Sequence, residues 1–189
     1  GYGGYAAAIV PGWTQFATWI RNGGVLVMAH LRGGGEFGPD WWQQGRLKLK
    51  QNSYNDVHAI AEDLIRRGLT TAQQLGVHGG SNGGTMAAVA AVQRPDLYRA
   101  SVPQVPQLDL LARVRDPIAM NASMDGGDPL DPEMSQVLYA YSPYQNVSDD
   151  VRYPAMYIDS GLNDARCPPW HGRKFAARLQ NAPANDAPV

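Results

Sequence analysis

Segment 79–83 has the sequence GGSNG, which matches the pattern G-x-S-x-G with Ser81 at its centre. A short apolar stretch, 75–78, comes before it, and a stretch rich in Ala, Met and Val, 85–93, comes after it. The pattern therefore predicts a sharp turn between a strand and a helix, in which the serine has a strained backbone and an exposed hydroxyl. A glycine-rich turn without chemistry is the alternative, but the flanking strand and helix favour a catalytic nucleophile.

The residues around Ser81 are suited to a developing negative charge. The backbone amide of Asn82 would point toward an oxyanion, and the amino terminus of the following helix adds a favourable electrostatic field. Gly79 and Gly83 lack the Cβ atoms that would collide where the strand and the helix approach each other. We therefore expect acyl-transfer chemistry at this turn.

A serine nucleophile of this kind needs a histidine base and an acid that orients the base, in the chain order Ser, Asp, His. Asp164 lies in the turn 161–166, which follows the apolar stretch 155–159, and is the candidate acid. Asp159 is less suitable, because its own strand would hold it. The alternative for Asp164 is a turn aspartate whose side chain bonds local backbone amides.

No histidine stands where the base is needed. His30 ends a predicted strand, His58 lies in a predicted helix, and His78 precedes the nucleophile in its own strand. His171 follows the candidate acid too closely, at the start of a helix, whereas the base belongs on a loop after one more strand. We therefore expect the catalytic histidine to lie beyond Val189.

The other predicted elements alternate between strands and helices. The predicted strands are 24–29, 75–78, 100–102 and 155–159, and the predicted helices are 53–67, 85–93 and 172–180. Ser53 is the expected cap of the first helix and Gly68 its stop, while the stretch 108–150 is expected to be irregular. The alternation indicates an α/β protein with a doubly wound, mostly parallel sheet, and loop sequence at both ends indicates a domain truncated at both ends.

Further motifs accompany the Ser81 turn along the whole chain. They are YGGY at 2–5, LRGGGEFG at 31–38, KQN at 50–52, GGSNGG at 79–84, QRPDL at 93–97, YSPYQNV at 141–147 and NDAR at 163–166. In this order and spacing they resemble the motifs of the prolyl oligopeptidase family of serine peptidases. The resemblance implies an α/β-hydrolase fold. It also implies that residues 1–189 form part of a peptidase catalytic domain, with the family's β-propeller and C-terminal histidine loop absent.

The resemblance assigns roles to the residues that would carry out the reaction. Ser81 would be the nucleophile, and Asp164 would orient the missing histidine. The Asn82 amide and the Tyr2 hydroxyl would form the oxyanion hole.

The resemblance also implies a set of substrate-binding residues. Arg166 would hold a substrate carbonyl through charge-assisted hydrogen bonds. Tyr5 and Cys167 would line the pocket for the side chain before the scissile bond. Proline-specific members stack the proline ring on a tryptophan, and a count along the chain places that position at Ala122. A family tyrosine four residues further on falls at Gly126, so a preference for proline is in doubt.

The composition excludes several other classes of function. Hydrophobic residues at 44% and charged residues at 17%, with a net charge of −1, are typical of one globular domain without the basic stripe of a nucleic-acid-binding protein. No apolar stretch is long enough to span a membrane. No cluster has metal-ligand spacing, and we expect no metal or cofactor. We expect a cytoplasmic protein, while a periplasmic or secreted location stays open because the sequence begins in mid-domain.

The sequence therefore predicts a serine peptidase that hydrolyses short peptides, in some cases after proline, with the present chain inactive because it lacks the histidine. An esterase-like α/β-hydrolase and a non-catalytic protein on the same fold are the alternatives. The sequence does not indicate an oligomeric state.

Overall fold

The computed structural model describes residues 2–5, 16–116, 118 and 125–189. Its sheet contains three parallel strands in the order β1-β2-β3, which are Gly76–Gly80, Ala100–Gln104 and Ala155–Met156. The helices are α1 (Ala17–Arg21), α2 (Pro39–Gln43), α3 (Gln51–Arg66), α4 (Asn82–Gln93), α6 (Pro132–Tyr141) and α7 (Trp170–Gln180), with short 3₁₀ turns at Leu47–Leu49 and Ala112–Arg115. The predicted α/β class with a parallel sheet is confirmed.

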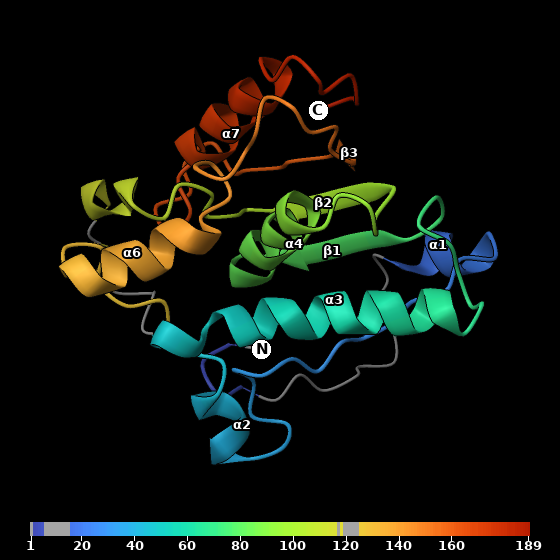
Figure 1. The fold of residues 1–189 in the computed structure, drawn as a ribbon, viewed down its shortest axis with the longest axis horizontal. Coiled ribbons are helices and arrows are strands. Elements are labelled where there is room, and N and C mark those ends of the chain that lie inside the picture. The colour runs from blue at the N-terminus through green and yellow to red at the C-terminus, as the bar shows by residue number, and fades with distance from the viewer. Residues whose placement is uncertain (1, 6–15, 117, 119–124) are drawn as a thin grey trace.

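Helix α4 is the centre of the packing. In Figure 1 it lies in front of β1 and β2, with α3 below it and α7 above it. Its sequence is apolar nearly all round, as expected of a helix covered on every side. Ala88 and Ala91 pack in a cluster with Phe175 of α7, while Ala87 packs in a cluster with Val57 of α3. The turn at the amino end of α4 is therefore attached to the most deeply buried element of the described chain.

Most predicted elements are present, with shifted ends. The predicted strands at 75–78, 100–102 and 155–159 correspond to β1, β2 and β3, and the closing helix corresponds to α7. Helix α3 begins at Gln51, so Ser53 is not its cap. The Ser53 hydroxyl instead donates a hydrogen bond to the Arg32 carbonyl at 2.5 Å. The predicted stop at Gly68 is confirmed, since this glycine has a φ of 69° just after the helix.

Two predictions about secondary structure are wrong. Residues 24–29 do not form a strand, because the structure shows no strand ladder between them and any other described residue. The stretch 108–150 is not irregular throughout, because it contains α6. Asp131 caps that helix by accepting hydrogen bonds from the amides of Glu133 and Met134, and Pro132 occupies the first turn.

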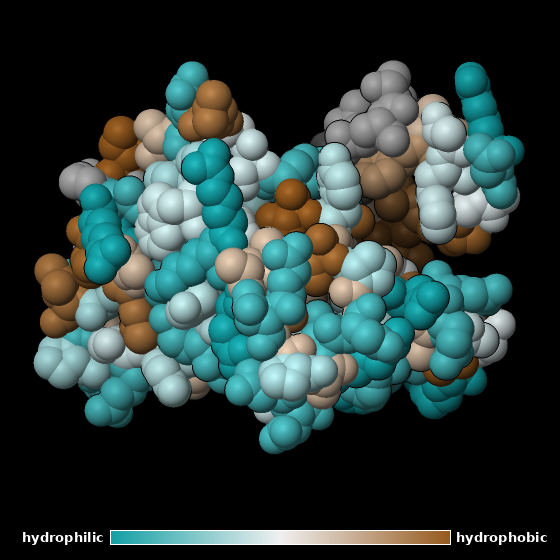
Figure 2. Space-filling model, turned by 90° about the horizontal axis from the view of Figure 1, so that it is seen from above, coloured by the Kyte–Doolittle hydropathy of each residue, from teal (hydrophilic) through white to brown (hydrophobic). Residues whose placement is uncertain are grey.

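The surface of the described residues includes several large apolar side chains. Val25 is 78% exposed, and Tyr157, which directly follows β3, is 68% exposed. Figure 2 shows hydrophobic side chains at several places on one face, including a hollow near its centre, among mostly hydrophilic ones. Among the described residues, no helix combines the length and apolar character needed to cross a bilayer.

Candidate active site

Ser81 occupies the single residue between the end of β1 and the start of α4. Its backbone has φ 57° and ψ −119°, a conformation that residues with a Cβ atom rarely adopt. Two hydrogen bonds hold it there: the Ser81 amide donates to the Gln104 carbonyl at 2.9 Å, and the Thr85 amide donates to the Ser81 carbonyl at 3.0 Å. The strained turn predicted from the sequence is therefore present.

Gly79 and Gly84 make this turn possible, and the sequence predicted this role for Gly79 but not for Gly84. A Cβ atom on Gly79 would clash with the backbone of Gly83, as expected. A Cβ atom on Gly83 would meet nothing within 4 Å, so the prediction for that glycine is wrong. The second close approach is instead at Gly84, where a Cβ atom would clash with the Gln104 carbonyl of β2. Gly84 therefore allows α4 to lie directly against the sheet.

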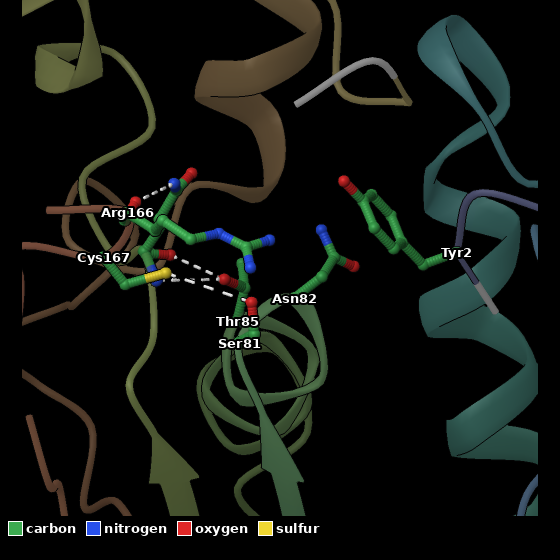
Figure 3. Close-up of a pocket in the computed structure, with 7 residues that line it drawn as sticks. Tyr2, Ser81, Asn82, Thr85, Arg166 and Cys167 are labelled. Atoms are coloured by element: carbon green, nitrogen blue, oxygen red, sulfur yellow. Dashed lines mark hydrogen bonds between the residues drawn. The ribbon is translucent and has the colours of Figure 1, made fainter. Parts of the chain in front are cut away.

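A cavity of about 40 Å³ opens at the Ser81 turn. It is lined by Tyr2, Ser81, Asn82, Thr85, Gln107, Arg166 and Cys167. Five of the seven predicted site residues are among them, namely Tyr2, Ser81, Asn82, Arg166 and Cys167. In Figure 3, Arg166 and Cys167 approach from one side and Tyr2 from the other, with Ser81 and Asn82 between them.

Thr85 and Gln107 were not predicted, and they fix one wall of the cavity. The Thr85 hydroxyl donates to the Gln107 carbonyl at 2.9 Å and accepts from the Gln107 amide at 3.2 Å. The Gln107 side-chain amide then donates to the Arg166 carbonyl at 3.1 Å (Figure 3). Thr85 lies one helical turn after Ser81, a spacing that would have placed it on the same side of α4. For Gln107 the sequence held no such signal.

Asp164 lies outside the set of residues that line the cavity and forms a local turn. Its Oδ1 atom accepts hydrogen bonds from the amides of Arg166 at 2.8 Å and Cys167 at 2.9 Å. The local role considered from the sequence is therefore present, and it orients the two residues that form the cavity wall. The Oδ2 atom of Asp164 takes no part in these two bonds. The local turn is therefore compatible with the predicted hydrogen bond between Asp164 and a histidine.

The Tyr2 hydroxyl is poised to act as a hydrogen-bond donor. Burial raises the pKa of this hydroxyl, the negative charge of Asp125 raises it further, and Arg166 opposes the rise. The hydroxyl therefore keeps its proton at neutral pH, as an oxyanion donor must. Tyr5, by contrast, is 75% exposed and is not among the residues that line the cavity, and its role in a pocket stays a prediction.

Cys167 lies beside Ser81 in the cavity. Its Sγ atom is 3.9 Å from the Ser81 hydroxyl. Burial raises the pKa of the Cys167 thiol, which keeps it protonated and poorly nucleophilic at neutral pH. The structure thus favours the role of a pocket residue.

None of the four histidines lines the cavity. His171 is buried, and its Nδ1 atom accepts hydrogen bonds from the amides of Leu108 at 3.3 Å and Asp109 at 3.2 Å. Burial lowers the pKa of His171 to about 4, so its ring is neutral and fixed in the core at neutral pH. His78 instead bonds the Gln104 side chain at 2.7 Å. In the part of the chain that the structure describes, no cluster of His, Cys, Asp and Glu could hold a metal ion.

A parallel sheet whose strand ends in a strained serine turn, followed by a buried helix, defines the α/β-hydrolase class. Residues 12–188 match the model of the prolyl oligopeptidase family. The chain belongs to that family of serine peptidases.

Known relatives and solved structures agree with this membership. The chain is 38% identical over 182 residues to an uncharacterised peptidase of Sinorhizobium fredii and 37% identical over 183 residues to a prolyl endopeptidase of Dictyostelium discoideum. These matches cover 95% of this chain but only 25% and 24% of the two relatives. The structure resembles a post-proline cleaving enzyme from Rickettsia typhi with a TM-score of 0.91 and 34% identity, over 99% of this chain and 27% of that one. The chain thus spans about a quarter of the length of these proteins.

The glycine contacts predict opposite effects for two neighbouring substitutions. Gly84→Ala should lower the free energy of unfolding by about 1–3 kcal/mol, because its Cβ atom would push α4 away from the Gln104 carbonyl. Gly83→Ala should raise it by about 0.5–1 kcal/mol, because its Cβ atom enters open space on a helix. Urea unfolding of both variants tests this, and equal effects would show that α4 does not pack on β2 as described.

Proposed function

We propose that this chain supplies the nucleophile, the oxyanion hole and the acid of a serine peptidase that hydrolyses short peptides. The observation that supports this most directly is the strained Ser81 backbone at the mouth of a cavity that Tyr2, Asn82 and Arg166 share. A strained backbone of this kind persists where the surrounding structure fixes it, and it recurs at catalytic sites.

Each wall of the cavity has a part in this reaction. The Ser81 hydroxyl attacks the carbonyl carbon of the scissile bond, and its proton passes to a histidine and then to the leaving amine. The oxyanion receives hydrogen bonds from the Asn82 amide, which lies in the first turn of α4 where amides have no partner within the helix, and from the Tyr2 hydroxyl. The guanidinium of Arg166 binds a substrate carbonyl. Water then releases the acyl group from Ser81.

The base in this proposal is a histidine outside the 189 residues. The supporting observation is that all four histidines of the chain are placed away from the cavity. Asp164 would orient the ring of that histidine through the carboxylate oxygen that the local turn leaves unused. The full-length protein, rather than this chain, is therefore the form in which activity is expected.

In the full-length protein, Ser81→Ala should lower kcat at least about 10⁴-fold, because the members of a triad act as a unit. The loss should appear in steady-state hydrolysis of short chromogenic peptides, with little change in substrate binding. Ser148→Ala is the matched control, since it removes the same hydroxyl from an exposed turn and should leave kcat unchanged. A Ser81→Ala variant that retains a tenth of the activity would remove this serine from the mechanism.

We also propose that the enzyme cleaves after a wider range of residues than proline. Tyr2 is the one aromatic residue among those that line the cavity, and Thr85, Gln107 and Cys167 give the wall polar or small side chains. Ala122, where the family tryptophan is expected, lies outside the described residues. Loss of a stacked aromatic contact typically forfeits about 0.5–1.5 kcal/mol, which corresponds to roughly a tenfold loss of preference.

The full-length protein should therefore hydrolyse peptides after alanine or larger residues at kcat/KM values comparable to those after proline. A matched series of peptides that differ only in the residue before the scissile bond measures this. A preference for proline above about a hundredfold would exceed what this cavity explains. It would mean that another aromatic side chain completes the pocket.

A further inference from the structure

A buried carboxylate lies beneath the segment that bears Tyr2. The side chain of Asp125 accepts a hydrogen bond from the Gly3 amide at one oxygen and from the Trp42 indole N–H, at 3.1 Å, at the other. The Nε atom of Arg46 lies 3.9 Å from the same carboxylate. The three partners come from the amino-terminal segment, from α2 and from the loop after it. Asp125 thus connects parts of the chain that are distant in sequence.

Backbone and ring contacts extend this connection. The Leu47 amide donates to the Asp125 carbonyl at 2.6 Å, so the main chain of Asp125 is fixed as well as its side chain. The guanidinium of Arg46 stacks over the Trp42 ring at 4.5 Å. A Cβ atom on Gly4 would lie 3.4 Å from that ring, so the indole also packs against the Tyr2 segment.

The three partners of the Asp125 side chain among the described residues are all donors, and this restricts which residue can stand at the position. An ionised carboxylate accepts at both oxygens and donates nothing, whereas an amide side chain would turn one N–H group toward a donor. The buried charge is compensated by Arg46 and by Lys50. Burial lowers the pKa of Lys50 to about 8, and the charge of Asp125 opposes that decrease. A neutral side chain in place of Asp125 would therefore leave the N–H donors without a full acceptor and the cations of Arg46 and Lys50 without a counter-charge.

The Tyr2 segment depends on such anchors because its own backbone is permissive. Gly3 and Gly4, with φ of 62° and 66°, follow Tyr2 directly. Glycine adopts many conformations at similar energy, so an unanchored glycine pair would let the tyrosine ring move. The Gly3 amide belongs to the peptide group that joins Gly3 to Tyr2. The bond from this amide to Asp125 therefore fixes the backbone of Tyr2 itself.

We propose that Asp125 is a positioning residue that holds the Tyr2 hydroxyl in line with the oxyanion, through the Gly3 amide. The proposal rests on the proposed function, in which Tyr2 donates to the oxyanion. An oxyanion donor is effective only when it is already in place as the charge develops, so a shift of the tyrosine costs rate rather than affinity.

A double-mutant cycle in the full-length protein tests this. Tyr2→Phe alone should lower kcat by about 10²–10³-fold, the usual cost of one oxyanion donor. Asp125→Asn alone should lower kcat at least about tenfold, with KM changed by less than about threefold, since the hydroxyl is misplaced but still present. In the Tyr2→Phe background, Asp125→Asn should change kcat by less than about threefold, because no hydroxyl remains to be positioned.

Two further variants complete the experiment: one is a matched control, and the other replaces Asp125→Asn if that variant does not fold. Asp128→Asn changes an exposed carboxylate that accepts only from the nearby Leu130 amide among the hydrogen bonds described, and it should leave kcat unchanged. If Asp125→Asn does not yield folded protein, Trp42→Phe replaces it in the cycle. That variant removes one of the donors that fix the carboxylate. It should lower kcat less than Asp125→Asn would, and this loss too should disappear in the Tyr2→Phe background.

The cycle separates failure of this proposal from failure of the proposed function. Equal losses of kcat from Asp125→Asn, or from its replacement Trp42→Phe, with and without the Tyr2 hydroxyl would overturn the positioning role. So would a change confined to KM. If Tyr2→Phe leaves kcat intact while Ser81→Ala abolishes it, the positioning role fails and the peptidase function stands. Turnover retained by Ser81→Ala would overturn the proposed function itself.

Discussion

The positive φ of Ser81 is the constraint on which the rest of the site depends. This backbone leaves Ser81 exposed at the start of α4, but the turn is strained and needs support from the surrounding structure. Part of this support is the hydrogen bond that the Gln104 carbonyl accepts from the Ser81 amide. The rest is the close packing of α4 on β2 at Gly84. Because α4 is buried among α3, α6 and α7, the packing energy of the whole domain stabilises one unfavourable residue.

The two walls of the cavity are held by separate sets of polar contacts. On one side, Thr85 and Gln107 connect α4 to the Arg166 backbone, and Asp164 shapes the turn that presents Arg166. On the other side, Asp125 connects the Tyr2 segment to α2. Thr85 belongs to α4 and bonds Ser81 directly, whereas Arg166 and Tyr2 are held in place by hydrogen bonds of loop segments. This arrangement suits a site in which small displacements of a donor alter the reaction rate.

Local sequence patterns predicted the parts of this structure that local forces determine. The strand before Ser81, the helix after it and the stop at Gly68 follow from short-range sterics and periodicity, and each is present. The prediction failed where distant parts of the chain decide the outcome. Residues 24–29 have the composition of a strand but no strand partner among the described residues, and Gly84 is needed chiefly because Gln104 approaches it. Gln107 and Asp125 act through partners far away in sequence, which no local pattern reveals.

We propose that Ser81 becomes a nucleophile only when a histidine from outside this chain completes the site. Reaction with a fluorophosphonate, followed by mass spectrometry of the labelled peptide, measures this directly. In the full-length protein we expect one adduct per molecule, on Ser81, whereas the 189-residue chain should react at least about 10³-fold more slowly because an unassisted hydroxyl is a weak nucleophile. Labelling at another residue of the full-length protein, or equally fast labelling of Ser81 in the shorter chain, would show that Ser81 is not activated by such a histidine.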